Sequence, residues 1–152
     1  MQNLEIYCVT DKEVPFLEKT NYKLAAVGLG KFSQRYIRCD KKDNIFHKEK
    51  NYSELTFHYW FWKNELKKFN SNTWIGFCQK RRFWVKDKIK IRNLKTLRNN
   101  LISKPDKKWK KYNSIICKPI RVDKPKKIKI LKRGWRNLTK DPSVLINQKK
   151  QT

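Results

Sequence analysis

Short apolar runs predict three strands. Residues 4–9 (LEIYCV) and 73–78 (TWIGFC) are rich in β-branched and aromatic side chains and show no polar alternation, which is typical of strands buried on both faces. Residues 114–117 (SIIC) form a shorter run of the same kind. In open α/β sheets the carboxyl ends of the strands bind ligands, so the residues that directly follow each run are the first candidates for chemistry.

A further apolar run, residues 22–29, closes on Gly28 and Gly30. The two glycines favour a tight backbone turn, because the G-x-G-x-x-G pattern of a phosphate-binding loop is not completed. Residues 31–50 are polar and mixed in charge, and they predict a loop.

The clearest helix signal begins at Asn51, which precedes Glu54 by three residues, as in a capping box. A stripe at i, i+4, i+7 and i+11 then predicts the core-facing side of the helix. Other apolar residues cover the remaining sides, so we expect a helix buried between layers. The stripe consists of Leu55, Tyr59, Trp62 and Leu66, and the other apolar residues are Phe57, Trp60 and Phe61.

A second amphipathic helix is predicted over residues 91–101, where leucine and isoleucine recur at helical spacing. Residues 127–131 (KIKIL) alternate like an edge strand whose lysines face water. The order strand, loop, helix, strand, helix, strand predicts an α/β sheet with flanking helices. We assign residues 1–120 to this domain and residues 121–152 to a basic, partly irregular C-terminal extension.

Length and charge narrow the function classes. The 152 residues fit one domain, their 13% aromatic content argues against disorder, and no run approaches the about 20 apolar residues of a membrane span. No secretory signal is recognisable, so we expect a cytoplasmic protein. The net charge is +26, of which residues 77–152 contribute +22 from 26 basic and 4 acidic side chains. Such a field attracts nucleic acid, nucleotide phosphates or anionic lipid, although 30 Lys against 9 Arg also fits the codon bias of an AT-rich gene.

The cysteines lack the spacing of a metal site or a disulfide framework. They stand far apart, without a C-x-x-C pair, and predict free thiols in a reducing compartment. These residues are Cys8, Cys39, Cys78 and Cys117.

Arg81 and Arg82 follow the predicted strand 73–78 almost directly. Paired guanidinium groups at the end of a buried strand are suited to bidentate binding of an anionic ligand. An exposed basic turn is the alternative interpretation of the same spacing.

The segments NYSELTFHYWFWKN (51–64) and WIGFCQKRRFW (74–84) resemble the signature of a bacterial family of unknown function. That family is attached to capsular polysaccharide and exopolysaccharide synthesis, and its members are often called glycosyltransferases. The opening IYCVTDK (6–12) is similar to the family's start, I-Y-V-x-T-H-K. The resemblance spans about residues 4–84 and, more loosely, residues 112–119.

The chain departs from the family pattern at several positions. Gln79 and Lys80 stand where the family has His and Tyr before its paired arginines, and Asp11 stands where it has His. The later His and Asp pattern of the family is not found in residues 118–152. A truncated or divergent member is therefore expected.

The resemblance implies a nucleotide-sugar-dependent transferase with an A-type, Rossmann-like α/β fold, acting on a growing surface glycan. Arg81 and Arg82 would then clamp the donor diphosphate. Thr10, Asp11 and Lys12 would complete the donor site, with Asp11 touching the ribose or the base.

Glu54 is either a catalytic base or acceptor contact or simply a helix cap. The D-x-D motif that usually clamps a metal in such enzymes is absent, so no metal is assigned. Because surface-glycan acceptors are often lipid-linked, peripheral contact with the inner face of an anionic membrane is compatible with this function.

Two other function classes stay open. The departures favour a catalytically inactive remnant that binds a glycan or a partner enzyme. A basic nucleic-acid-binding protein is the other alternative, because aromatic residues interleaved among lysines suit base stacking, although no recognised binding motif is present. These aromatic residues are Trp84, Trp109, Tyr112 and Trp135.

Overall fold

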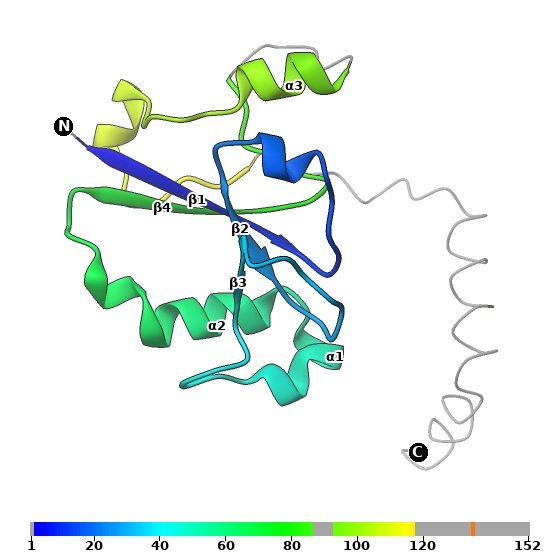
Figure 1. Ribbon diagram of the computed structural model, residues 1–152. Helices are drawn as coiled ribbons and strands as arrows, with labels where there is room; N and C mark the ends of the chain where they lie inside the picture. Colours follow the sequence, from blue (N-terminus) through cyan, green and yellow to red (C-terminus); the bar gives the residue numbers. More distant parts are fainter. Residues whose placement is uncertain (1, 87–92, 118–134, 136–152) are drawn as a thin grey trace. The chain divides into compact units, whose positions relative to one another are not determined.

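The computed structural model describes residues 2–86, 93–117 and 135 (Figure 1). Four parallel strands form one sheet in the order β3-β2-β1-β4. The strands are β1 (Asn3–Thr10), β2 (Lys23–Ala26), β3 (Tyr36–Arg38) and β4 (Thr73–Gln79). The α-helices are α1 (Glu49–Tyr52), α2 (Leu55–Asn64) and α3 (Leu94–Asn100), and 3-10 turns lie at Leu17–Lys19 (η1), Phe46–Lys48 (η2), Leu66–Lys68 (η3) and Lys107–Lys111 (η4).

The predicted α/β class is confirmed in its coarse form, a parallel sheet flanked by helices. Alternate side chains of β1 enter two different cores, as the period of a strand requires. Ile6 and Cys8 pack with Leu97 and Leu101 on the α3 side. Tyr7 and Val9 pack with Phe57 and Phe61 on the α2 side. Because both faces are covered, β1 and β4 carry apolar runs, as parallel strands do.

The sheet and the helices lie within one compact unit, Met1–Asn113, and Ser114–Thr152 form a second unit. No helix in the described part of the chain has the length and apolar character needed to cross a bilayer. The predicted boundary between residues 1–120 and 121–152 stays a prediction, and the predicted strand at residues 127–131 lies outside the described residues.

Two expectations about secondary structure are wrong, and one strand was not predicted. The stretch 31–50 is more than a loop, because it contains β3, η2 and the start of α1. Residues 23–26, to which no element was assigned, form the central strand β2. Residues 114–117 form no strand. The short strands β2 and β3 exist because they add to β1 in register, with Cys8 opposite Leu24 and Ala25 opposite Ile37, and such pairing leaves little trace in a run of three or four residues.

The predicted capping box is also wrong. Asn51 lies inside α1, which ends at Tyr52, and the next residue, Ser53, has a φ of 46°. Glu54 is the residue before α2, but its side chain makes no capping hydrogen bond. The hydroxyl of Thr56 donates instead to the carbonyl of Ser53 at 2.7 Å. The helix is therefore interrupted at Ser53, and α2 begins without the reciprocal hydrogen bonds of the predicted capping box.

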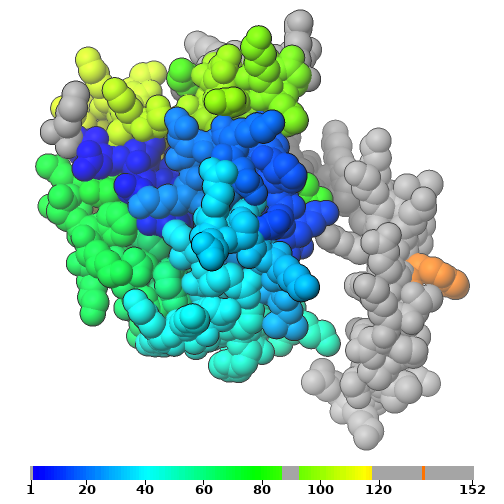
Figure 2. Space-filling view, in the orientation of Figure 1, coloured from blue at the N-terminus to red at the C-terminus, as the bar shows by residue number. Residues whose placement is uncertain are grey.

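The core-facing side of α2 differs from the prediction. Thr56, Phe57, Trp60 and Phe61 are buried, and the rings of Phe57 and Phe61 contact Tyr7 of β1. Figure 2 shows that the crossover from β3 to β4, coloured cyan to green, lies on the surface of the molecule. The predicted core stripe is on the outer side of this crossover, with Leu55, Trp62 and Leu66 exposed. Both sides of α2 are apolar, and the one with more aromatic area is buried.

Candidate functional site

The strand order changes direction between β1 and β4. From β1 the chain continues to β2 and β3 on one side, and β4 then joins the other side of β1. Open α/β sheets bind ligands outside the carboxyl ends of the strands at this topological switch point. Thr10, Asp11 and Lys12 end or follow β1, and Arg81 and Arg82 follow β4, so these predicted site residues belong to the loops at the switch point.

Asp11 and Lys80 join these two loops by an ion pair. Lys80 is in a four-residue turn, closed by the N–H of Arg82 donating to the carbonyl of Gln79 at 3.0 Å. Its ammonium donates to the Asp11 carboxylate. This hydrogen bond is the main reason why the pKa of Asp11 lies below its usual value. The switch point therefore carries a fixed charge pair that spans β1 and β4.

Thr10 shapes the loop after β1 from within the fold. It is buried, and its hydroxyl donates to the carbonyl of Lys12 at 2.6 Å while accepting the Lys12 N–H at 3.3 Å. The carbonyl of Thr10 accepts the N–H of Val27 at 2.9 Å. These bonds present the exposed side chains of Asp11 and Lys12 beyond the sheet edge. Direct contact of Thr10 with a donor stays a prediction.

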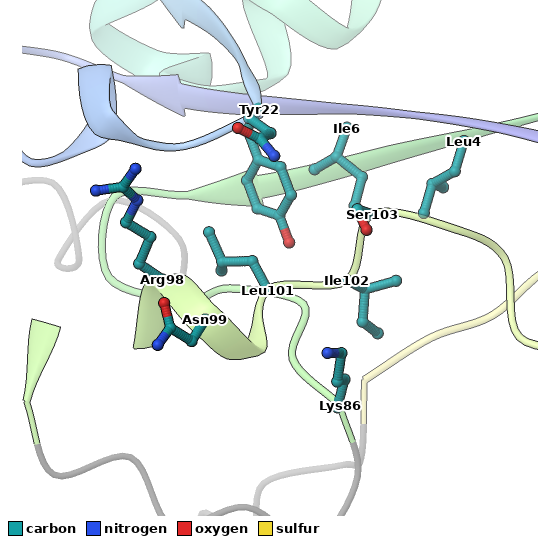
Figure 3. Close-up of a pocket in the computed structure, with 10 residues that line it drawn as sticks. Leu4, Ile6, Tyr22, Lys86, Arg98, Asn99, Leu101, Ile102 and Ser103 are labelled. Carbon is teal, nitrogen blue, oxygen red and sulfur yellow. The ribbon is translucent and has the colours of Figure 1, made fainter. Parts of the chain in front are cut away.

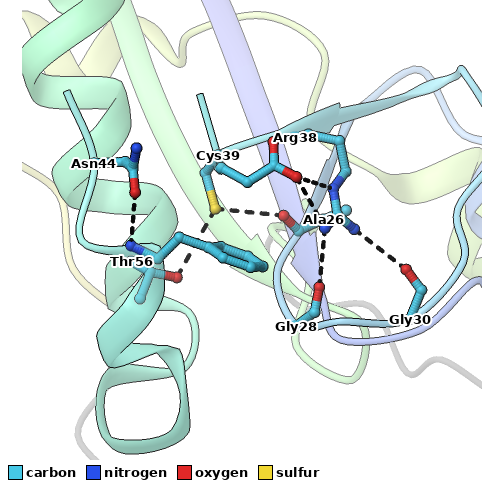
Figure 4. A network of polar contacts seen from close by, with 9 residues as sticks. Ala26, Gly28, Gly30, Arg38, Cys39, Asn44 and Thr56 are labelled. Atoms are coloured by element: carbon cyan, nitrogen blue, oxygen red, sulfur yellow. Dashed lines mark hydrogen bonds and ion pairs between the residues drawn. The ribbon is translucent and has the colours of Figure 1, made fainter. Parts of the chain in front are cut away.

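The loop after β2 completes the same edge. Gly28 has a φ of 83°, which confirms the predicted tight turn. The Arg38 guanidinium donates to the carbonyls of Gly28 at 3.1 Å and Gly30 at 3.4 Å and pairs with Asp40 at 3.2 Å (Figure 4). A side chain on Gly28 would meet the Glu49 carboxylate at 3.6 Å. Arg38 thus ties the ends of β2 and β3 together.

Arg81 and Arg82 are exposed residues of the turn after β4. Their place in the chain agrees with both sequence interpretations, a ligand clamp at the strand end and an exposed basic turn. Sequence reasoning singled out these two residues and missed Lys80, whose half-buried ammonium makes the contact with Asp11. One feature of the sequence could have pointed to Lys80: the resembled family has a tyrosine at this position.

Glu54, the residue directly before α2, and His58 of α2 lie one helical turn apart, and both are half-buried. The centroids of the His58 and Phe77 rings are 4.4 Å apart, and Phe77 lies two residues before the end of β4. Burial lowers the pKa of His58, and the nearby Glu54 charge offsets part of this shift. His58 is therefore neutral at physiological pH. Sequence reasoning considered Glu54 alone, although the i, i+4 spacing connects the two residues.

The cysteines are all free, as predicted, and three of them are buried. Cys8 and Cys78 are opposite each other on β1 and β4, and Cys39 directly follows β3. Across residues 2–86 and 93–117, no group of three or more His, Cys, Asp or Glu side chains is arranged to hold a metal ion.

A groove of about 460 Å³ lies on the α3 side of the sheet (Figure 3). Its lining includes Leu4 and Ile6 of β1, and Ile6 precedes the end of β1 by four residues, about 13 Å along a strand. The groove is thus separate from the carboxyl edge. Sequence reasoning missed it because its walls come from distant segments. The other lining residues are Asn21, Tyr22, Lys86, Arg98, Asn99, Leu101, Ile102 and Ser103.

Comparison with known proteins gives one match. Residues 5–149 match the family described as a domain of unknown function, DUF4422. No curated protein and no solved structure matches the chain. Since the match covers almost the whole sequence, the chain belongs to the DUF4422 family.

Proposed function

We propose that the protein is a glycosyltransferase of the A-type α/β fold, which binds a nucleotide-sugar donor at the carboxyl edge between β1 and β4. One observation carries the proposal. The Asp11–Lys80 pair joins the loops of the two strands at the topological switch point, where parallel sheets bind nucleotides. The sequence resemblance to proteins of surface polysaccharide synthesis supplies the reaction class.

The donor diphosphate is the group whose negative charge the protein must stabilise. Glycosyl transfer leaves negative charge on the departing diphosphate, and cations placed there stabilise the transition state. Lys12, Arg81 and Arg82 are exposed at this edge, and Arg81 and Arg82 carry the planar forks that bind phosphate oxygens in pairs. In this proposal they hold the diphosphate, while Lys80 keeps the loop after β4 against β1.

In this proposal the Asp11 carboxylate accepts a hydrogen bond from the nucleotide. Because its pKa is lowered, the carboxylate is charged at neutral pH and accepts hydrogen bonds only. More than half of its side chain is exposed, which leaves an oxygen for the ribose or the base of the nucleotide. A negative charge here is tolerated beside the donor because Lys80 neutralises it.

Glu54 is the proposed base that accepts the proton of the acceptor hydroxyl. It follows α1, whose first residue, Glu49, lies against the Gly28 turn at the carboxyl edge. Neutral His58, one turn along α2, is a second group that can accept a proton. The acceptor in this proposal is a surface glycan, attached to lipid at the cytoplasmic face of a membrane.

The nucleic-acid alternative has less support from the aromatic residues. Trp84 is half-buried, and its indole N–H donates to the carbonyl of Phe77 at 2.8 Å. The ring of Trp109 packs against Trp74 with 5.5 Å between the ring centroids. Two of the four aromatic residues that would stack on bases are therefore engaged in packing.

The test is thermal unfolding of the full chain with single nucleoside diphosphates, their sugars, and short oligonucleotides of equal charge. A specific donor at 100 times its Kd adds about 2.7 kcal/mol to the stability at physiological salt. The double variant Arg81→Ala/Arg82→Ala loses this response. The control Lys107→Ala/Lys108→Ala removes the same charge from η4 and keeps it.

An equal response to every polyanion, vanishing as salt rises, would overturn the proposal and leave a general basic surface. Selective stabilisation without any transfer or hydrolysis of the sugar would identify the inactive remnant. Loss of turnover in Glu54→Gln with donor binding retained would support the role of Glu54 as base.

A further inference from the structure

The outer side of α2 carries an apolar stripe that the fold does not use. Leu55 is 55% exposed, Trp62 is 57% exposed, and Leu66, in the following turn η3, is 43% exposed. Exposed large apolar side chains that stand singly need no explanation, but these follow one another along the outside of one helical segment. Leu55 and Trp62 of α2 and Leu66 of the following η3 together indicate a surface made for contact.

The stripe is continuous through an aromatic pair. The rings of Tyr59 and Trp62 are 5.8 Å apart and nearly perpendicular, at 80°. Leu55 precedes Tyr59 by four residues, which places the two side chains side by side on the helix. The Lys63 ammonium lies 4.1 Å from the centroid of the Trp62 ring and 5.7 Å from that of Tyr59. An apolar ridge with an indole, a phenol and an ammonium therefore runs along α2.

Three lysines adjoin the C-terminal half of this ridge. Lys63, Lys67 and Lys68 are exposed over the last turn of α2 and η3. The carboxylate of Glu65 is engaged by Lys68 at 2.6 Å. Two further acids adjoin the ridge: Asp43, which accepts the Tyr59 hydroxyl at 3.1 Å, and half-buried Glu54, which directly precedes Leu55. Lysines next to exposed Trp, Tyr and Leu form the side-chain set of a helix that lies in a lipid interface.

We propose that the outer side of α2 and η3 binds the surface of an anionic membrane, with Leu55, Trp62 and Leu66 between the lipid headgroups and the lysines against lipid phosphates. Trp and Tyr favour the headgroup region because they combine an apolar ring with a polar atom. Lysine stems lie along the apolar layer while the ammonium groups stay in water. Charge complementarity selects anionic lipid over a neutral bilayer.

This inference goes beyond the proposed function, since it concerns a different surface from the carboxyl edge. Such binding would hold the protein at the membrane surface with the outer side of α2 toward the lipid. A protein without any transferase activity would keep this property.

The experiment measures binding of the full chain to vesicles of phosphatidylcholine alone and of phosphatidylcholine with about a third phosphatidylglycerol. The variant Leu55→Glu/Trp62→Glu changes the stripe. The matched control is Leu94→Glu/Tyr112→Glu, which removes one leucine and one aromatic residue of similar exposure, 60% and 59%, and adds the same charge outside α2. Thermal unfolding of each variant shows that the fold is retained.

The expected result is binding to the anionic vesicles that falls at least about tenfold in the stripe variant and much less in the control. Equal losses in both variants would overturn the inference, because general positive charge would then explain the binding. Absence of vesicle binding by the native chain would overturn it as well. Self-association that only the stripe variant loses would assign the stripe to a second copy of the chain instead.

Discussion

The ammonium of Lys80 donates a hydrogen bond to the carboxylate of Asp11, a residue 69 positions away in the chain. The sheet makes this contact possible. Val9 is the partner of Gln79 in the register of β1 and β4, so the residues that follow the two strands emerge side by side. The pair lies at the edge where the strand order reverses, and it connects the two loops that we propose to hold a nucleotide-sugar donor.

Replacing Asp11 by Asn should weaken nucleotide binding more than it weakens the fold. The pair is partly exposed, so its loss is expected to lower the free energy of unfolding by at most about 1 kcal/mol. Glu18→Gln breaks another partly exposed pair, that with Arg35, and is the control. Denaturant unfolding measures the stability, and titration with a nucleoside diphosphate measures the affinity. Equal nucleotide affinity in native protein and Asp11→Asn would contradict the role of Asp11.

The contribution of the Asp11–Lys80 pair to the free energy of unfolding depends on pH. The folded state lowers the pKa of Asp11, so the contribution is complete above the unfolded value of about 3.9 and is lost as the pH falls through the folded pKa. Unfolding measured between about pH 2 and pH 6 should therefore show a smaller loss of stability for Asp11→Asn than for the native protein. Parallel curves for the two proteins would contradict this prediction.

Phe57 and Trp62 test which side of α2 faces the core. Phe57→Ala should lower the free energy of unfolding by about 3–5 kcal/mol, because the ring is fully buried against Tyr7 and Phe77. Trp62→Ala should change it by about 0.5 kcal/mol or less, since the side chain is exposed. Denaturant unfolding of both variants is the measurement. The reverse order of the two effects would show that the predicted stripe is the core after all.

His58 should titrate below its ordinary pKa of about 6.5, because burial disfavours the charged ring. The unfolded chain then takes up this proton more readily than the folded one, so stability falls as the pH drops below about 6.5. Glu54→Gln removes the opposing charge and should lower the pKa of His58 further. Proton NMR of the His58 ring measures both values, with His47→Gln identifying the signal. A pKa above 6.5 would contradict the buried position.

Gly28 and Gly30 should respond differently to alanine. Gly28 has a φ of 83°, a region that side chains disfavour, so Gly28→Ala is expected to lower the free energy of unfolding by about 1–2 kcal/mol. A side chain on Gly30 would meet the Phe32 ring at 3.4 Å, an ordinary contact, and Gly30→Ala should have a smaller effect. Thermal unfolding compares the two. Equal effects would show that the turn does not depend on the backbone of Gly28.

Part of this picture follows from local sequence alone. The runs at residues 4–9 and 73–78 determined β1 and β4, because strands covered on both faces need apolar residues at every position. The glycine pair indicated the turn after β2, and the residues after each run identified the edge that carries the candidate site. These features depend on neighbours in the chain, so a single sequence contains their signal.

Tertiary structure decided the rest. The strands β2 and β3 are too short to be recognised alone, and they form because β1 offers hydrogen-bonding partners. Both sides of α2 are apolar, so the sequence alone does not show which side faces the core. Packing against Tyr7 and Phe77 places Phe57 inward and leaves Trp62 outward. Lys80 meets Asp11 because two strands distant in sequence are adjacent in the sheet. Such choices depend on contacts between distant residues, for which local patterns carry no information.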